Sequence, residues 1–234
     1  MTLTIILKEL RALGSQKNVQ GMVRFGITSE KAFGVSAPKI RALAKRIGKD
    51  HHLALELWKT EYHEARILAA LLAEAECATL GQMDQWVREM SNWAQCDASC
   101  AEYFEKTRYA YQLPARWCAS PKEFVRRAGV VMIAVLAVHH KGTDDHVFEE
   151  FFPLLKACST DERNFVRKGV NWALRQIGKR NIRLHKKAIA LSKEIQNIPS
   201  RSAAWIAADA LRELNSPKTI ALIQRKKVPY ELHE

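Results

Sequence analysis

The stretch FVRRA at residues 124–128 returns 41 residues later in a closely similar form, as FVRKG at residues 165–169. A serine, followed three residues on by a glutamate, precedes each copy, at residues 120–123 and 159–162. This spacing is typical of a capping box at the start of a helix, and an apolar helical pattern follows each copy. A helical unit that recurs about every 40 residues is the signature of HEAT-like and armadillo-like repeats.

The rest of the chain favours the same architecture. Apolar residues recur three and four positions apart, and alternating strand-like runs are scarce. Ser36-Ala37-Pro38 and Ser216-Pro217 predict two further helix starts, and Gly14, Gly48 and Gly142 predict helix ends. We expect an all-α fold, a right-handed α-solenoid of HEAT-like or armadillo-like repeats with a basic concave face, forming one domain over residues 1–234. An irregular helical bundle is the alternative.

The charge of the chain is strongly basic and unevenly spread. Lys and Arg number 37 against 25 Asp and Glu, a net charge of +12. Residues 114–234 hold 22 of the basic and 12 of the acidic residues, so most of the excess lies in the C-terminal half. Such a balance favours an acidic partner, with nucleic acid first and an anionic membrane surface second. A basic surface that serves only solubility is the other interpretation.

Metal-dependent and nucleotide-dependent chemistry find no support in the sequence. The five cysteines include no CxxC pair, and no nucleotide-binding, α/β-hydrolase or HExxH pattern occurs. We therefore expect no metal, no cofactor and reduced, mostly buried thiols. The longest strongly apolar stretch, residues 129–138, is too short to cross a bilayer, and no targeting segment is found. The prediction is a cytoplasmic protein without a membrane partner.

One predicted helix combines cations with an aromatic residue on a single face. Lys168, Trp172, Arg175 and Lys179 follow one another at spacings of four, three and four. Lysine and arginine at these positions would meet phosphates, and the indole could pack on sugars or bases. The alternative is that Trp172 covers a joint between repeats, with the cations around it.

A second candidate is the pair Trp93 and Asp97, four residues apart and thus on one helix face. A carboxylate beside an indole face can stabilise a developing cation. The same spacing recurs at Trp205 and Asp209, amid alanine and isoleucine, and there we expect it to serve packing.

Other basic residues extend the positive field. Arg126 and Arg127 open the helix of the first FVRRA copy, where they would contact a phosphate or be solvated. Lys168 is the equivalent of Arg127 in the second copy. The tail at residues 225–227 is predicted to be a disordered basic arm.

Together these segments resemble the family of AlkD-like DNA alkylation repair glycosylases. The resemblance covers FGVSAPKIR at residues 33–41, the W-x-x-x-D of Trp93 and Asp97, the VRRA of residues 125–128, and KGVNWALR at residues 168–175. It implies a HEAT-like solenoid that cradles double-stranded DNA and hydrolyses the N-glycosidic bond of N3- and N7-alkylated purines without flipping the base.

The resemblance also implies roles for particular residues. Trp93, Asp97 and Trp172 would surround the deoxyribose of the lesion, and Arg127 would hold the nearby phosphate. The sequence departs from the family pattern around Trp93, with Asn92, Ala94 and Cys96 in place of Trp, Asp and Val. Phe25 stands where a tyrosine near the lesion is often found. The expected protein is a monomer.

Two other functions stay open at this stage. A non-catalytic solenoid would bind bent or branched DNA by shape, although phosphate binding alone has no use for Asp97. A protein-interaction scaffold would present an apolar groove instead of the stripe formed by Lys168, Arg175 and Lys179.

Overall fold

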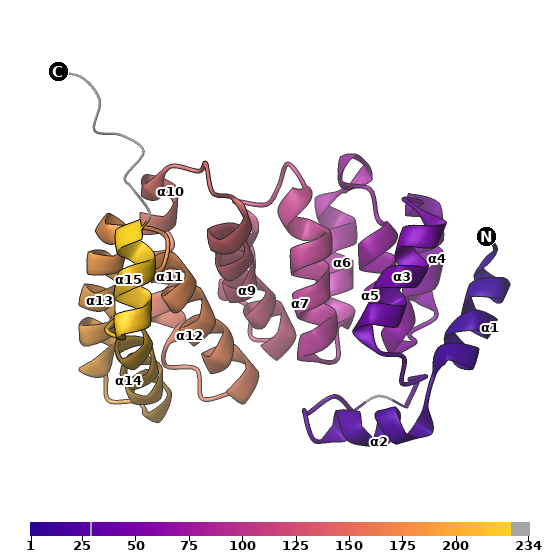
Figure 1. Cartoon of the computed structure of the whole chain (residues 1–234), viewed down its shortest axis with the longest axis horizontal. Helices are drawn as coiled ribbons and strands as arrows, with labels where there is room; N and C mark the ends of the chain where they lie inside the picture. Colours follow the sequence, from indigo (N-terminus) through magenta and orange to yellow (C-terminus); the bar gives the residue numbers. More distant parts are fainter. Residues whose placement is uncertain (29, 226–234) are drawn as a thin grey trace. The chain divides into compact units, whose positions relative to one another are not determined.

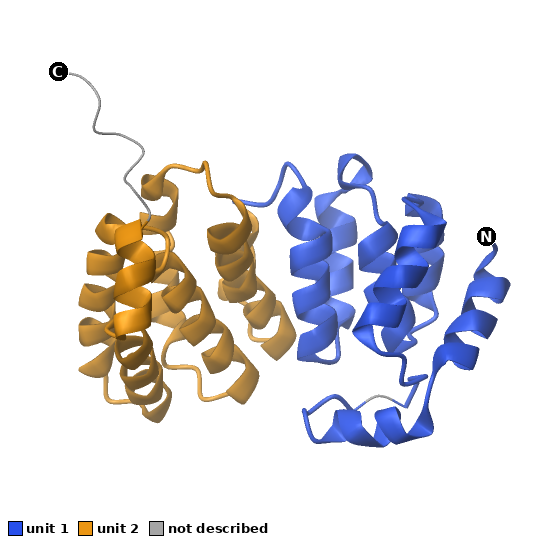
Figure 2. Cartoon of the chain, viewed as in Figure 1, with its two compact units in different colours: residues 1–111 blue, residues 112–234 orange. Residues whose placement is uncertain are grey.

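The computed structural model describes residues 1–28 and 30–225, and every regular element within these residues is a helix. The expected all-α fold is therefore confirmed. The chain separates into two compact units, residues 1–111 and residues 112–234, which Figure 2 distinguishes by colour. The single continuous domain expected from the sequence stays a prediction beside these two units.

The first unit consists of seven α-helices and two 3-10 turns within its described residues (Figure 1). These are α1 (Leu3–Leu13), α2 (Gln16–Val23), α3 (Ala37–Ile47), α4 (His51–Lys59), α5 (His63–Leu72), η1 (Ala75–Cys77), α6 (Leu80–Glu89), α7 (Trp93–Glu102) and η2 (Phe104–Lys106).

An aromatic cluster forms much of the core of this unit. The rings of Trp58 and Trp86 stack with centroids 4.1 Å apart, and Tyr103 tilts against Trp86. All three side chains are almost fully buried. Each large aromatic ring removes about 150–250 Å² of surface from water, so this stack holds α4 against α6.

The second unit consists of eight helices within its described residues (Figure 1). These are α8 (Leu113–Cys118), α9 (Glu123–His139), α10 (Asp145–Glu149), α11 (Phe152–Cys158), α12 (Asn164–Gly178), α13 (Ile182–Gln196), α14 (Arg201–Leu214) and α15 (Pro217–Arg225).

The repeated segments found in the sequence lie on neighbouring helices. α9 packs against α12, which in turn packs against α14. The equivalent residues Phe124 and Phe165 face each other with ring centroids 5.8 Å apart. At Gly169 an added Cβ would come within 2.7 Å of Val130, so the glycine lets α9 and α12 approach closely. The 41-residue repeat is thus a stacking of like helices, as expected for HEAT-like units.

The two predicted capping boxes do not form. α9 begins at Glu123 rather than after Ser120, whose hydroxyl instead accepts from the backbone N–H of Lys122. The hydroxyl of Ser159 donates to the Lys156 carbonyl at the end of α11. Glu162 serves a different helix, because its carboxylate accepts from Ser200 and from the backbone N–H of Ser202 at the start of α14.

Most of the other predicted helix boundaries are confirmed. α3 begins directly after Ser36 and α15 directly after Ser216, while Gly14 and Gly48 follow the ends of α1 and α3. Gly142 is two residues too late, because α9 ends at His139. Four of the five cysteines are buried as expected, Cys77 is exposed, and all are free thiols. Of the predicted basic tail, residues 226–227 lie outside the described residues.

Within residues 1–28 and 30–225, no helix combines the length and the apolar character that a membrane span requires.

Candidate nucleic-acid interface

The helix that carries Trp93 and Asp97 begins at Trp93 itself. Asn92 precedes it in an extended conformation and its side-chain oxygen accepts from the backbone N–H groups of Ala94 and Gln95. An asparagine cap of this kind stabilises a helix start by about 1 kcal/mol. Both Trp93 and Asp97 are partly exposed on the same face of α7. Asn92, a departure from the family pattern, therefore fixes where the helix with both candidate residues starts.

Asn92 is in turn held by His63. Because the Asn92 oxygen already accepts two backbone N–H groups, its Nδ2 donates to Nδ1 of His63, 3.2 Å away. Both side chains are buried, and burial lowers the pKa of His63 although the charge of Glu64 opposes this. The lowered pKa keeps the imidazole neutral, which is the form that can accept the bond.

Trp93 reaches a distant part of the first unit. Its indole Nε1 donates to the backbone carbonyl of Phe25, 2.8 Å away, across 68 positions of sequence. Phe25 is 67% exposed and follows Arg24, the C-cap residue of α2. Two of the residues that the sequence selected are thus brought together, through the indole of one and the backbone of the other.

Glu64 holds the segment between Phe25 and α3. Its side chain is fully buried, and its carboxylate accepts from the backbone N–H groups of Phe33, Gly34 and Val35 at 2.9, 2.6 and 3.1 Å. Gly34 has φ +76°, and an added Cβ would meet the carbonyl of Ser15 at 2.2 Å. This explains why a glycine is needed in the FGV segment.

Sequence reasoning missed both polar groups of the α5 N-terminus, His63 and Glu64. Two adjacent polar residues at the start of an apolar helix are the signal that could have found them. Their bonds join the segment that bears Phe25 to the helix that bears Trp93, so the local arrangement of both depends on the first turn of α5.

In the second unit, the two arginines of the FVRRA stretch have structural partners. Arg126 donates to Asp161 Oδ2 at 2.8 Å and to the Ser120 carbonyl. Arg127 is only 6% exposed, and its Nη1 donates to the Phe165 carbonyl at 2.5 Å. Both side chains therefore bind the segment that begins α12. The equivalent residue of the next repeat, Lys168, is exposed.

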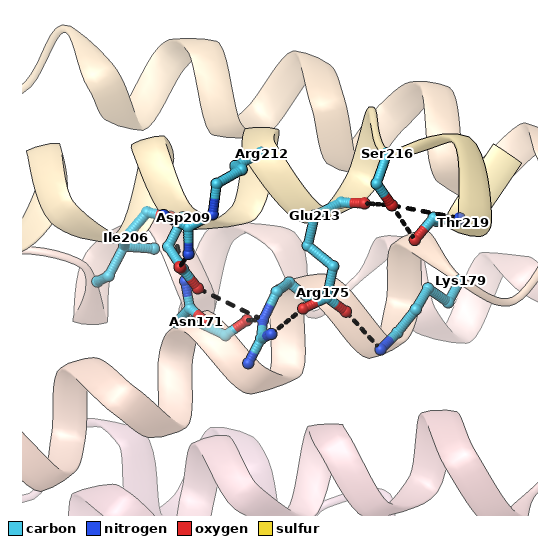
Figure 3. A network of polar contacts seen from close by, with 9 residues as sticks. All are labelled: Asn171, Arg175, Lys179, Ile206, Asp209, Arg212, Glu213, Ser216 and Thr219. Carbon is cyan, nitrogen blue, oxygen red and sulfur yellow. Dashed lines mark hydrogen bonds and ion pairs between the residues drawn. The ribbon is translucent and has the colours of Figure 1, made fainter.

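The predicted stripe on α12 divides into two halves. Lys168 is exposed and Trp172 partly so. With the Gln176 amide oriented to satisfy its neighbours, its oxygen accepts from Trp172 Nε1 and Lys179 Nζ, both at 3.1 Å. Towards the helix end, Arg175 and Lys179 form ion pairs with the two carboxylate oxygens of Glu213 on α14, as Figure 3 shows.

These ion pairs lower the pKa of Glu213. Burial would raise its pKa, but hydrogen bonds from Lys179 and Arg175, together with their charges, outweigh burial and lower it. About a fifth to a third of each of the three side chains is exposed. Two of the three cations in the stripe are therefore paired with one acid of the neighbouring helix.

The second W-x-x-x-D pattern lies on α14, beside this network. Asp209 pairs with Arg212 and lies 3.9 Å from Nε of Arg175 (Figure 3). Trp205 packs against Arg167 but is 37% exposed, so the packing expected of the indole covers only part of it. The exposed part belongs to the outward face of α14, which also carries the exposed Ala204 and Ala208.

The structure thus places the sequence-predicted residues in two groups. Phe25, Trp93 and Asp97 belong to the first unit, and Arg126, Arg127, Lys168, Trp172, Arg175 and Lys179 to the second. Within the described part of the chain, no cluster of three or more His, Cys, Asp or Glu side chains could hold a metal ion.

Comparison with known structures places the chain among the HEAT-like repeat proteins. One solved protein superimposes with a TM-score of 0.75 at 19% sequence identity, covering 91% of this chain and 95% of the other. That protein belongs to "a new family of proteins related to the HEAT-like repeat DNA glycosylases with affinity for branched DNA structures". A designed armadillo repeat protein is also found, at 16% identity and with a TM-score of 0.33 over 89% of this chain and 92% of the other.

Comparison with protein families is more specific. Residues 6–214 match the family described as DNA alkylation repair enzyme, and the chain belongs to that family. A search of curated proteins finds no match. The resemblance inferred from residues 33–41, Trp93, Asp97 and residues 168–175 is therefore confirmed at the level of the family, and DNA is the partner that the family implies.

Proposed function

We propose that this protein is a DNA glycosylase that releases cationic N3- and N7-alkylated purines from duplex DNA. The observation that carries the proposal is the arrangement of α7, which presents Trp93 and Asp97 together on a partly exposed face. A protein that only binds phosphates has no use for a carboxylate there, because it would repel the DNA backbone.

The chemistry of alkylated purines suits a carboxylate and an indole. Alkylation at N3 or N7 gives the base a positive charge, so it leaves without help from a general acid. The remaining sugar develops oxocarbenium character, as in glycoside hydrolysis. The Asp97 carboxylate would stabilise this charge and orient a water toward C1′, and the face of Trp93 would add a cation–π contact.

Other residues would bind the DNA around the lesion. The exposed side chain of Phe25, whose backbone carbonyl accepts from Trp93, would pack against a nucleotide, and the resemblance assigns the second indole to Trp172. Lys168 is the exposed cation of the α12 stripe and would contact a phosphate. Arg175 and Lys179 would contribute less, because Glu213 already neutralises much of their charge. Arg126 and Arg127 would act mainly by holding the start of α12.

A second candidate is non-catalytic binding of branched DNA. It is favoured by the similar solved protein, whose family is described as having affinity for branched DNA structures. The replacements at Ala94 and Cys96 next to the candidate carboxylate are also compatible with lost catalysis. The same chain would then keep the DNA-binding cations without turning over a lesion.

Base release from duplex DNA containing N7-methylguanine or N3-methyladenine separates the two candidates. The wild type and Asp97→Asn are compared with a reaction lacking protein, and binding of each to the same duplex is measured over a salt titration. The glycosylase proposal expects release by the wild type that falls by about 10²–10³ in the variant, with binding kept. No release above background, with salt-sensitive binding intact, would contradict it in favour of the second candidate.

A further inference from the structure

The exposed Trp205 of α14 is covered on one side by an arginine of the neighbouring helix. The guanidinium of Arg167 on α12 lies 5.0 Å from the centre of the Trp205 ring. The Arg167 Nε is buried without a hydrogen-bond partner within the described residues, so the contact with the ring takes the place of an ion pair at this end of the side chain. A guanidinium over an indole forms a cation–π contact and presents a flat, adjacent surface of its own.

Two further exposed cations lie within one helical turn of Arg167 or Trp205 in the sequence. Arg201 is exposed one helical turn before Trp205, and Lys168 is exposed next to Arg167 in sequence. Neither forms an ion pair in the described part of the chain. The acidic neighbour is Glu162, whose carboxylate already accepts from Ser202 and Ser200. These bonds lower the pKa of Glu162, and the charges of Arg167 and Arg201 add to the effect.

The surface around the indole leaves room for a ligand. The outward face of α14 continues from Trp205 through Ala204 and Ala208, both exposed. With such short side chains beside it, the uncovered part of the indole is accessible to a flat group. Exposed aromatic residues interleaved with cations are how proteins bind nucleic-acid strands without reading their sequence.

We propose that Arg167, Lys168, Arg201 and Trp205 form a DNA-strand site, with phosphates bound by the cations and one nucleotide packed on the Arg167–Trp205 stack. We name this set the α12–α14 patch. The proposal rests on the proposed DNA-binding function, but it adds a contact that neither the family resemblance nor the α12 stripe assigns. It also places cations for DNA at the starts of α12 and α14, while Arg175 and Lys179 near the end of α12 are held by Glu213.

Equilibrium binding to fluorescent DNA tests the patch, with the full chain and a salt titration for each variant. Trp205→Ala is expected to weaken binding about fivefold to thirtyfold while leaving the slope of log K against log salt unchanged. Arg201→Gln and Lys168→Gln are each expected to lower that slope by about 0.9 on duplex DNA. Trp205→Phe, which keeps an aromatic face, should retain most of the affinity.

Matched controls come from the same unit. Lys193→Gln on α13 removes an exposed lysine, and Ile182→Ala removes an exposed apolar side chain that is 44% accessible. Both should leave DNA binding unchanged. Dextran sulfate, a polyanion without bases or deoxyribose, should bind Trp205→Ala and the wild type equally. Thermal melts of all variants verify that the fold is kept.

Two DNA substrates identify the packed group, a blunt duplex and the same duplex with a single-stranded extension. A loss in Trp205→Ala confined to the extended substrate identifies an unpaired base, and an equal loss on both identifies a sugar; either supports the patch. Unchanged DNA binding in Trp205→Ala and Arg201→Gln would overturn it. Failure of the wild type to bind any DNA would instead contradict the proposed function itself, which keeps the two failures distinguishable.

Discussion

Two helices of this protein, α7 and α14, carry the same pattern of a tryptophan followed four residues later by an aspartate. Trp93 and Asp97 occupy α7, and Trp205 and Asp209 occupy α14. Both helices also begin with a side-chain cap, and both tryptophans keep part of their surface exposed. Local sequence and local structure therefore do not distinguish them.

Their partners do. The Trp93 indole donates to the backbone of Phe25, an exposed residue from a distant segment of its unit. The Trp205 indole lies under Arg167, and Asp209 is engaged by Arg212 and approached by Arg175. An aspartate among arginines is suited to holding helices together, and an indole under an arginine to binding a strand. The comparison teaches that contacts between distant segments, rather than spacing, decide what this pattern can do.

The largest loss of folding stability is expected when the buried carboxylate of Glu64 is removed. Glu64→Ala leaves the backbone N–H groups of Phe33, Gly34 and Val35 without their acceptor. Each buried unsatisfied group costs about 1–3 kcal/mol, so the free energy of unfolding should fall by about 3 kcal/mol or more. Thermal denaturation should show a Tm lower by roughly 6–12 °C.

The counterpart on the α14 side is Glu162→Ala, which removes an exposed acid that accepts from Ser200 and Ser202. It should change the Tm little. If the Tm falls equally in Glu64→Ala and Glu162→Ala, the segment between Phe25 and α3 does not depend on a buried acid. The α7 and α14 sides would then not differ in this respect.

The His63–Asn92 bond predicts a pH dependence for the α7 side. Because the folded-state pKa of His63 lies below its ordinary 6.5, the unfolded chain binds the proton first as the pH falls. The stability is therefore complete above about pH 6.5 and declines below it, by up to about 1.4 kcal/mol per pH unit.

Urea denaturation at pH values between 5 and 7.5 measures this decline, with His63→Gln as the comparison, because its amide oxygen can still accept from Asn92. The variant should lose less stability than the wild type over this range. Identical pH profiles would rule out His63 as the titrating group.

A smaller effect is expected at the network of α14. Glu213→Gln weakens the pairs with Arg175 and Lys179, which are partly screened by water, so the loss of stability should be about 1 kcal/mol. Since the folded-state pKa of Glu213 is lowered, its contribution is present above about pH 4.5 and disappears as the pH falls below that value. Denaturation at pH 7 and pH 3 measures both. A variant that loses as much at pH 3 as at pH 7 would contradict the ion-pair explanation.

The smallest effect separates the two indoles. Trp93→Phe keeps a ring but removes the N–H donor to Phe25, and one hydrogen bond contributes about 0.5–1.5 kcal/mol. Base release should therefore slow by about twofold to tenfold, whereas Trp205→Phe should leave the rate of release at saturating DNA unchanged. Single-turnover kinetics measure both variants, and an equal slowing would show that the N–H bond has no special role.

The repeat architecture could be predicted because it follows from local sequence patterns. A near-identical stretch at residues 124–128 and 165–169 implies equivalent helices, and their phenylalanines do face each other. Spacing of four was also enough to place Trp93 and Asp97 on one face of α7. Helix starts failed at Ser120 and Ser159, because serine and glutamate side chains there found partners in a turn or on another helix.

The side-chain contacts between distant segments that build the candidate site could not be predicted in this way. Nothing in periodicity links Trp93 to Phe25, 68 positions earlier, or Glu64 to Gly34. The cationic stripe of α12 was read from one helix alone, so the acid that neutralises Arg175, Glu213 on the next helix, was not anticipated. Such pairs depend on which faces the helices turn to one another.

The most direct test of the account is a paired measurement of base release by Asp97→Asn and Asp209→Asn on duplex DNA containing N7-methylguanine. The two substitutions are chemically identical and lie at the same position of the same pattern on α7 and α14. The account predicts that Asp97→Asn slows release by about 10²–10³ and that Asp209→Asn leaves the rate unchanged. Equal rates for both variants and the wild type would contradict the assignment of catalysis to the Trp93–Asp97 face.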